Sequence, residues 1–202
     1  MRTLSEREAS GLVRAAEGTR DEALIVLALR TGMRQGELAA LRWEDLELGG
    51  GRASIKVRRS ADTRTRTVVT ATKTGEARTI GIGPRTVEVL RAHRARQREE
   101  RMAAPTWEDL EWMFPNTRGK VRRRDSVMRS LHRMLAEAEL PADIRFDDLR
   151  HTVGTHALRR GRPIHEVSKM IGHADPAMTL RRYAHDLDDM RDATARAMDE
   201  LF

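Results

Sequence analysis

The chain alternates between two kinds of hydrophobic pattern. Before residue 42 and again after residue 83, apolar side chains recur at the three- and four-residue spacing of helices that bury one face. Ser5 followed by Glu8 is a capping-box pattern and predicts the start of the first helix. The apolar run over residues 23–29 places the second helix in the core, and Gly32 is expected to end it. The predicted helices span about residues 5–16, 20–31, 33–41, 84–102, 123–139, 146–160, 164–171, 176–184 and 187–201.

The stretch between these helical parts has a strand pattern. Residues 53–82 are rich in β-branched side chains that alternate with polar ones, and a run of glycines precedes them. We predict strands over about residues 53–59, 65–71 and 77–82, with Thr74 and Gly75 in the second turn. The expected fold is mainly α, of the α+β class, with a small three-stranded antiparallel sheet. Because no repeat or linker interrupts the chain, residues 1–202 are expected to form one domain.

The charge of the chain favours a polyanionic partner. Lys and Arg number 38 against 31 Asp and Glu, which gives a net charge of +7. An ordinary solvated surface explains this charge equally well, but the basic residues cluster beside the motifs described below. Such clusters suit DNA phosphates, whose neutralisation releases counterions. Aromatic residues make up only 3%, too few for a surface that stacks single-stranded bases, so double-stranded DNA is the predicted partner.

Several classes of protein are excluded by what the sequence lacks. It contains no cysteine, which rules out disulfides and thiolate chemistry. Its first residues lack the apolar run of a signal peptide, and no stretch approaches the roughly 20 apolar residues that span a bilayer. We therefore expect a cytoplasmic protein without a membrane partner. The absence of a Walker-type loop and of a carboxylate cluster predicts no nucleotide cofactor and no metal.

Tyr183 is the only tyrosine in the chain and the candidate nucleophile. A phenol attacks poorly in water because its ordinary pKa is about 10. Beside cations that hold a phosphodiester, however, it can attack phosphorus and form a covalent intermediate. Arg34, Lys73, Arg150 and His173 lie in segments that offer such cations or hydrogen-bond donors.

Each candidate also has an ordinary structural interpretation. Arg34 pairs at helical spacing with a glutamate three residues on, and Arg150 is one more arginine among many. Lys73 is consistent with a turn lysine that aids solubility, and His173 with a histidine that fixes its loop. A sole tyrosine is usually a core residue with its hydroxyl satisfied. The charged residues around Tyr183 argue against its deep burial: Arg181, Arg182, His185 and Asp186.

Three motifs occurring in one order decide between these interpretations. They are Thr-Gly-Met-Arg ending at Arg34, Leu-Arg-His-Thr around Arg150, and Ile-Gly-His-Ala around His173, followed by Tyr183. Together they resemble the catalytic domain of the tyrosine recombinases, the phage-integrase family, over about residues 4–201. Any one of them alone would be a weak signal.

The resemblance implies a role for each candidate. Arg34 and Arg150 would bind the non-bridging oxygens of the scissile phosphate, which planar guanidinium groups can do through paired hydrogen bonds. Tyr183 would form a 3′-phosphotyrosyl link while Lys73 protonates the departing 5′-oxygen, and His173 would donate a hydrogen bond to the phosphate. The 5′-hydroxyl of a partner strand would then reverse the step, without ATP or metal. The active assembly implied is a homo-tetramer on two synapsed DNA sites.

Asp147 departs from the family pattern, which usually has histidine three residues before the second arginine. A carboxylate beside two arginines is a weak base and repels a phosphate. We therefore expect either reduced activity or a different division of labour, with His151 or His173 assisting. His151 itself is expected to pack or bond within its own helix.

A second departure concerns the start of the chain. Family members usually carry an N-terminal helical domain that holds the other face of the duplex, and here the catalytic domain is expected to begin almost at the first residue. The chain would then be an excised fragment or a naturally short protein. A catalytic domain alone is expected to bind DNA weakly and with strong salt dependence. The last predicted helix has an apolar stripe that fits either a neighbouring subunit or its own domain.

The predicted function is site-specific DNA recombination by strand cleavage and rejoining. Two alternatives remain: a catalytically weakened DNA-binding relic or regulator, and a nicking-closing enzyme like the type IB topoisomerases. Retention of Arg34, Lys73, Arg150, His173 and Tyr183 speaks against a relic. The short chain and the Ile-Gly-His-Ala motif favour a recombinase over a topoisomerase.

Overall fold

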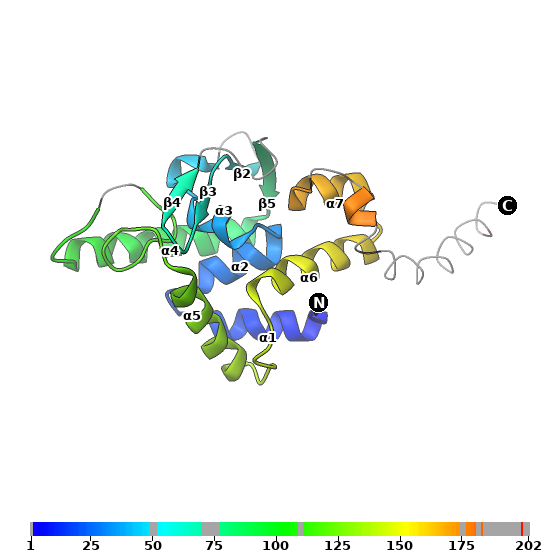
Figure 1. The fold of residues 1–202 in the computed structure, drawn as a ribbon, viewed down its shortest axis with the longest axis horizontal. Coiled ribbons are helices and arrows are strands. Elements are labelled where there is room, and N and C mark those ends of the chain that lie inside the picture. The colour runs from blue at the N-terminus through cyan, green and yellow to red at the C-terminus, as the bar shows by residue number, and fades with distance from the viewer. Residues whose placement is uncertain are drawn as a thin grey trace.

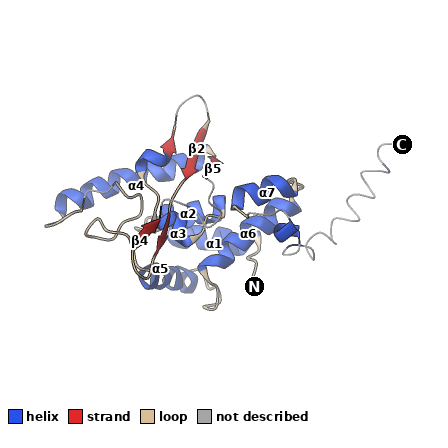
Figure 2. Cartoon of the chain, turned by 45° about the horizontal axis from the view of Figure 1, so that its top comes forward, coloured by secondary structure: helices blue, strands red, loops and turns tan. Residues whose placement is uncertain are grey.

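The computed structural model describes residues 2–48, 52–69, 77–108, 111–173, 177–180, 183 and 199. In this part of the chain, helices form the body of the molecule and short antiparallel strands cover one side of it (Figure 1, Figure 2). The predicted fold class, mainly helical with a small antiparallel sheet, is confirmed. The helices are α1 (Glu6–Ala16), α2 (Glu22–Thr31), α3 (Gln35–Ala39), α4 (Pro84–Ala103), α5 (Arg124–Glu137), α6 (Phe146–Arg159) and α7 (Ile164–Ile171), with a 3-10 turn at Trp43–Asp45.

These seven helices lie where the periodicity predicted them, and their ends have clear causes. In the capping box of α1, the Ser5 hydroxyl accepts a hydrogen bond from the Glu8 backbone, and the Glu8 carboxylate accepts one from the Ser5 backbone. Gly32 ends α2 in the left-handed conformation, with φ of 63°. Of the two further helices predicted near the C-terminus, residues 177–180 are helical. Most of the remainder lies outside the described residues.

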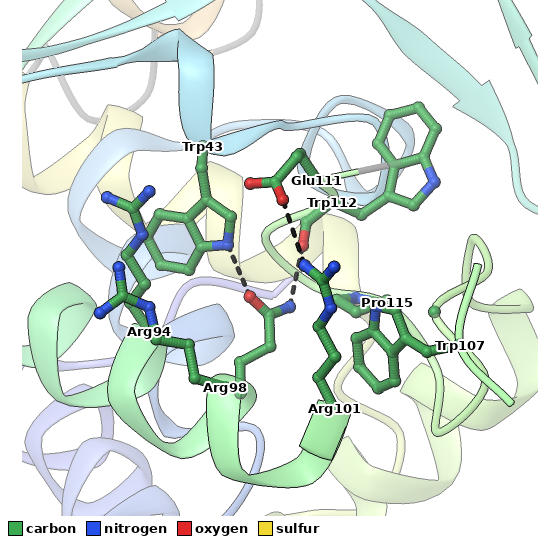
Figure 3. A pocket seen from close by; sticks show the side chains of 10 residues that line it. Trp43, Arg94, Arg98, Arg101, Trp107, Glu111, Trp112 and Pro115 are labelled. Atoms are coloured by element: carbon green, nitrogen blue, oxygen red, sulfur yellow. Dashed lines mark hydrogen bonds and ion pairs between the residues drawn. The ribbon is translucent and has the colours of Figure 1, made fainter. Parts of the chain in front are cut away.

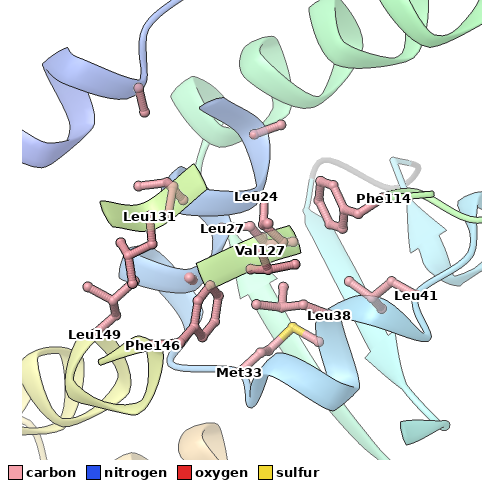
Figure 4. Close-up of a cluster of buried hydrophobic side chains, with 14 of the residues drawn as sticks. Leu24, Leu27, Met33, Leu38, Leu41, Phe114, Val127, Leu131, Phe146 and Leu149 are labelled. Atoms are coloured by element: carbon pink, nitrogen blue, oxygen red, sulfur yellow. The ribbon is translucent and has the colours of Figure 1, made fainter. Parts of the chain in front are cut away.

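Helix α2 is the centre of the core. Its residues from Ala23 to Ala28 are all buried, and it packs against α1, α4 and α6. Figure 4 shows Leu24 and Leu27 among apolar side chains from several other elements, including Phe146 at the start of α6. A helix that is apolar on all sides is buried, so α2 is a rigid support for α3 and α6, the two helices that carry site residues.

The strands are arranged differently from the prediction. The three-stranded sheet has the order β1-β2-β5, and a separate two-stranded sheet joins β3 to β4. Strand β4 lies within the predicted strand over residues 65–71 but does not belong to the three-stranded sheet, so the predicted pairing is wrong. The predicted turn at Thr74 and Gly75 lies outside the described residues. The strands are β1 (Leu46–Glu47), β2 (Ala53–Val57), β3 (Ser60–Asp62), β4 (Thr67–Val69) and β5 (Arg78–Ile82).

A tight turn explains this difference. The Asp62 carboxylate accepts hydrogen bonds from the backbones of Arg64 and Thr65, and Arg66 adopts a positive φ of 62°. The chain therefore folds back at once, and β4 pairs with β3 next to it in sequence. Strand β2 pairs instead with β5, with Ile55 opposite Ile80.

Two close contacts at glycines bring together the segments that form the candidate site. Strand β3 lies so close to α3 that a Cβ atom on Gly36 would come within 2.6 Å of the Ala61 carbonyl oxygen. A Cβ atom on Gly32 would lie 3.0 Å from Ile171 at the end of α7. The start of α3 and the end of α7 therefore lie side by side.

No helix in the described residues is both long and apolar enough to cross a membrane.

Candidate active site

A polar cleft of about 590 Å³ lies between the start of α3, the first turns of α6 and the segment after α7. Arg34, Asp147, Arg150 and His173, four of the predicted site residues, line this cleft together. They come from positions up to 139 residues apart in the chain, and the fold brings them together. Lys73 lies outside the described residues.

Arg34 is held at the start of α3 by two partners. Its guanidinium Nη1 donates to Glu37 Oε1 at 3.2 Å, and Nη2 donates to the Gly172 carbonyl oxygen at 3.0 Å. Its backbone N–H also donates to Glu37 Oε2 at 2.9 Å. The pair with Glu37 is therefore real, and it fixes a guanidinium that still lines the cleft.

Glu37 is buried and also binds Arg78, which lies outside the sequence motifs. Arg78 Nη1 and Nη2 donate to the two oxygens of Glu37 at 2.9 and 2.7 Å. Burial opposes ionisation of Glu37, but the hydrogen bonds and charge of Arg78, aided by Arg34, hold its pKa below the usual value. A carboxylate that stays ionised keeps both arginines in place.

Arg78 also connects the sheet to α7. Its Nε donates to the Met170 carbonyl oxygen at 3.0 Å, and a Cβ atom on Gly172 would lie 2.7 Å from its guanidinium carbon. In β5, Arg78 is on the same buried face as Ile80. An arginine in phase with the inward residues of a strand was the available sequence signal, because such a charge needs a buried partner.

Arg150 is the most buried cation of the cleft. Its Nη1 donates to the Gly32 carbonyl oxygen at 2.7 Å, whereas its Nη2 is buried and has no hydrogen-bond partner among the described residues. Burial lowers the pKa of Arg150 to about 10, with the charges of Arg34 and Arg78 adding to the effect, so the group stays charged at neutral pH. A buried donor without a partner is costly, and an anionic oxygen in the cleft would satisfy it. Arg150 is therefore not a surface arginine.

His173 and Asp147 complete the wall of the cleft. The Nδ1 atom of His173 lies 2.7 Å from the hydroxyl of Thr179, and its backbone N–H donates to the Ser168 carbonyl oxygen at 3.0 Å. These contacts fix the loop and orient the ring, so both interpretations of His173 fit the structure. Asp147 is exposed on the first turn of α6.

Tyr183 is buried, with only 3% of its surface exposed, so the expectation that its charged neighbours would prevent deep burial is wrong. It packs in a cluster with Leu158, Val167 and Ile171. Its phenol lies so close to the α6 backbone that a Cβ atom on Gly154 would clash with its hydroxyl. Burial of a tyrosine depends on the helix face that it packs against, and not on the charges beside it in sequence.

The Tyr183 hydroxyl contacts His151. Its oxygen lies 3.3 Å from His151 Nδ1, and the two rings are 6.3 Å apart with a tilt of 57°. His151 also lines the cleft. The expectation that His151 only packs or bonds within its own helix is therefore wrong, since it joins the cleft to the candidate nucleophile.

A second pocket, of about 240 Å³, contains none of the predicted site residues (Figure 3). All three tryptophans line it, together with arginines of α4. Trp43 Nε1 donates to Gln97 at 2.6 Å, and Gln97 donates to the Trp112 carbonyl oxygen at 2.8 Å. These bonds tie the loop after α4 to that helix. In the described residues, no group of three or more histidine or acidic side chains is arranged to hold a metal ion.

Comparisons with known proteins identify the family. The chain matches the model of the Phage integrase family over residues 2–190 and therefore belongs to that family. It is 28% identical to a "Tyrosine recombinase XerC-like" protein of Caldanaerobacter subterraneus subsp. tengcongensis, over 99% of this chain and 54% of the relative. It is 32% identical to an "Integrase" of Streptomyces ambofaciens, over 100% of this chain and 53% of the relative. The resemblance inferred from the motifs is confirmed.

Solved structures share the fold. The Tn1549 transposon integrase in complex with transposon right end DNA superposes with a TM-score of 0.78, at 21% identity, over 100% of this chain and 66% of that one. At this identity the likeness shows the fold alone. The chain spans about half the length of the two relatives described above.

Proposed function

We propose that this chain is the catalytic domain of a tyrosine recombinase, which cleaves and rejoins double-stranded DNA at specific sites through a 3′-phosphotyrosyl intermediate. The observation that carries the proposal is the cleft that Arg34, Arg150 and His173 line together, in which Nη2 of Arg150 has no hydrogen-bond partner among the described residues. A phosphate oxygen is the ligand that satisfies such a group.

These positions support the following reaction. Arg34 and Arg150 bind the non-bridging oxygens, where negative charge grows in the transition state, and fixed cations stabilise that charge without rearranging. The Tyr183 oxygen attacks phosphorus, and the bond from phosphorus to the 5′-oxygen breaks. By family resemblance, Lys73 gives the departing oxygen its proton. The 5′-hydroxyl of a second strand reverses the step and joins the strands.

The proposed partners are DNA and further copies of the chain. Five arginines against two aspartates line the cleft, so its surroundings favour a polyanion. The resemblance implies a homo-tetramer on two synapsed sites for the full-length protein. Measuring the mass of complexes formed with two duplexes tests this assembly, and a single subunit on each isolated duplex contradicts it.

Covalent capture tests the chemistry. The chain is incubated with synthetic duplexes that carry a randomised segment and a nick beside it, so that a short fragment diffuses away after cleavage and the adduct accumulates. We expect protein–DNA adducts that survive denaturation and enrich a sequence, and none with Tyr183→Phe. Binding of the pool without any adduct contradicts catalysis and supports a DNA-binding regulator.

The products distinguish the two enzymatic alternatives. On duplexes of the enriched sequence, a recombinase joins strands between two duplexes. A nicking-closing enzyme of the type IB topoisomerase kind instead relaxes supercoils in a plasmid carrying the same sequence and exchanges no strands. Relaxation without exchange overturns the recombinase proposal but leaves the tyrosine chemistry intact.

A further inference from the structure

We infer that His151 is the catalytic residue that accepts the proton of Tyr183. The inference rests on the proposed function, because it assigns a step in that reaction. A phenol that attacks phosphorus must lose its proton, and Asp147 stands where the family usually has a histidine. The described part of the chain places another histidine against the phenol.

The first support is the contact itself. His151 Nδ1 lies 3.3 Å from the Tyr183 hydroxyl oxygen, within reach of the proton to be transferred. His151 is 7% exposed and Tyr183 3%, so the contact is buried in the protein. Because His151 also lines the cleft, it adjoins both the nucleophile and the place where a phosphate would bind.

The second support is the space made for the phenol on α6. Gly154 is one helical turn after His151, and a Cβ atom there would overlap the Tyr183 hydroxyl and ring. Helix α6 therefore offers a surface on which the phenol lies with its oxygen beside Nδ1. One helix thus supplies Arg150 to the phosphate and His151 to the attacking group.

The step requires His151 as a neutral imidazole, the form that accepts a proton. Apart from Arg34 and Arg150, the ionisable side chains that line the cleft with His151 are Asp62, Arg64, Arg124, Arg145, Asp147 and His173. Asp62 and Asp147 are the acidic groups among them. In the reactive tautomer the ring proton is on Nε2 and Nδ1 is the acceptor.

Asp147 acquires a function in this arrangement. It precedes His151 by four residues on α6, and both line the cleft, so the two are neighbours on one helix face. A carboxylate near an imidazole stabilises the imidazolium that forms when the proton arrives. The aspartate that departs from the family pattern thereby supports the base instead of replacing it.

The proton transfer balances in both directions. As the bond between the Tyr183 oxygen and phosphorus forms, the phenolic proton moves to His151 Nδ1, and the bond between phosphorus and the 5′-oxygen breaks. The departing oxygen takes a proton from the proposed acid, Lys73. On rejoining, the 5′-hydroxyl attacks phosphorus and gives its proton to Lys73, the bond between phosphorus and the Tyr183 oxygen breaks, and His151 returns its proton to the tyrosine.

The test compares His151→Asn with the unchanged chain on the duplex enriched by covalent capture. The asparagine amide oxygen can occupy the place of Nδ1 and accept a hydrogen bond, but it is not a base. At pH 7 we expect single-turnover cleavage to fall by about 100-fold, the lower end for loss of a general base. The deficit should shrink as pH rises toward the range in which phenols ionise without the help of a base.

A sulfur-substituted duplex separates this step from the other proton transfer. Sulfur in place of the bridging 5′-oxygen leaves readily without protonation, because a thiol has a pKa of about 8.5. It should restore cleavage by Lys73→Ala but leave His151→Asn slow at pH 7. The pH series is run on this duplex, so that ionisation of Lys73 does not affect it.

The outcomes are distinguishable. Wild-type cleavage that disappears in Tyr183→Phe supports the proposed function, whatever His151 does. A His151→Asn cleavage rate equal to that of the wild type at pH 7 overturns the inference. A rate deficit that is constant across pH also overturns it, because the two rates do not approach each other at high pH if the residue only positions the phenol. If His151→Asn does not fold, as judged by circular dichroism, His151→Gln is measured in its place.

Discussion

Two buried arginine–carboxylate pairs in this protein have the same chemistry and different consequences. Arg78 donates two hydrogen bonds to Glu37, and Arg122 donates two to Asp21. In both pairs burial opposes ionisation of the carboxyl group, yet the partner arginine holds its pKa below the usual value. Each pair joins segments that are far apart in sequence.

The difference lies in what else each carboxylate binds. Asp21 and Arg122, with Ser130 nearby, connect the start of α2 to α5 and lie apart from the polar cleft. Glu37 is shared with Arg34, which faces the cleft, and Arg78 also binds the carbonyl of Met170 beside the His173 loop. The first pair holds the fold together, whereas the second also holds a cation at the wall of the cleft. The two pairs therefore differ in that the carboxylate of the second also binds a cation that lines a cleft.

Removing the carboxylate charge from each pair tests the difference between them and has the largest expected effect. Glu37→Gln and Asp21→Asn should each destabilise the fold by about 3–5 kcal/mol, because each leaves a buried arginine without its counter-charge. Only Glu37→Gln should also slow cleavage, by about 100-fold, since Arg34 loses its support. Urea unfolding and single-turnover cleavage, measured where both variants are folded, check this. Equal cleavage defects in the two variants contradict the distinction.

Changing the arginines to lysine tests geometry at constant charge. A lysine cannot reproduce the two parallel hydrogen bonds to a carboxylate, so Arg78→Lys loses the bridge from Glu37 to Met170. We expect cleavage to fall by about tenfold, which corresponds to about 1.4 kcal/mol. The matched control is Arg122→Lys, which should lose stability and keep its cleavage rate. A normal rate for Arg78→Lys would show that Arg34 does not depend on it.

The acid sensitivity of the fold is the smallest expected effect. A carboxyl group whose pKa is lower in the folded state stabilises the protein above its unfolded pKa, near 4, and this contribution is lost as pH falls through the folded value. The free energy of unfolding should therefore decrease below about pH 4. Replacing the pair by Asp21→Asn with Arg122→Met should make this decrease smaller, because the variant lacks the carboxyl group whose pKa is lowered. An unchanged slope would contradict a depressed pKa for Asp21.

The sequence predicted the helices well because their signals are local. The capping box at Ser5, the apolar run of α2 and the glycine at its end each lie within a few residues of the structure they determine. The strand pairing failed because a turn with positive φ at Arg66 decided it. Strands β2 and β5 pair across a longer stretch of intervening chain, and residue propensities do not encode such long-range pairing.

The same distinction between local and long-range signals applies to the residues of the candidate site. Motifs identified Arg34, Arg150 and His173, and the fold brings them into one cleft. Arg78 went unnoticed because its partner Glu37 is 41 residues earlier in the chain. The burial of Tyr183 was misjudged because the packing of its phenol on α6 cannot be read from its charged neighbours.

Identifying the residue linked to DNA tests the central claim most directly. Adducts captured on the nicked duplex are digested with protease and nuclease, and the peptide that carries the nucleotide is sequenced by mass spectrometry. We expect the nucleotide on the peptide that contains Tyr183, attached through its 3′-phosphate. Attachment to any other residue, or through a 5′-phosphate, would contradict a cleft built to hold a phosphate for this tyrosine.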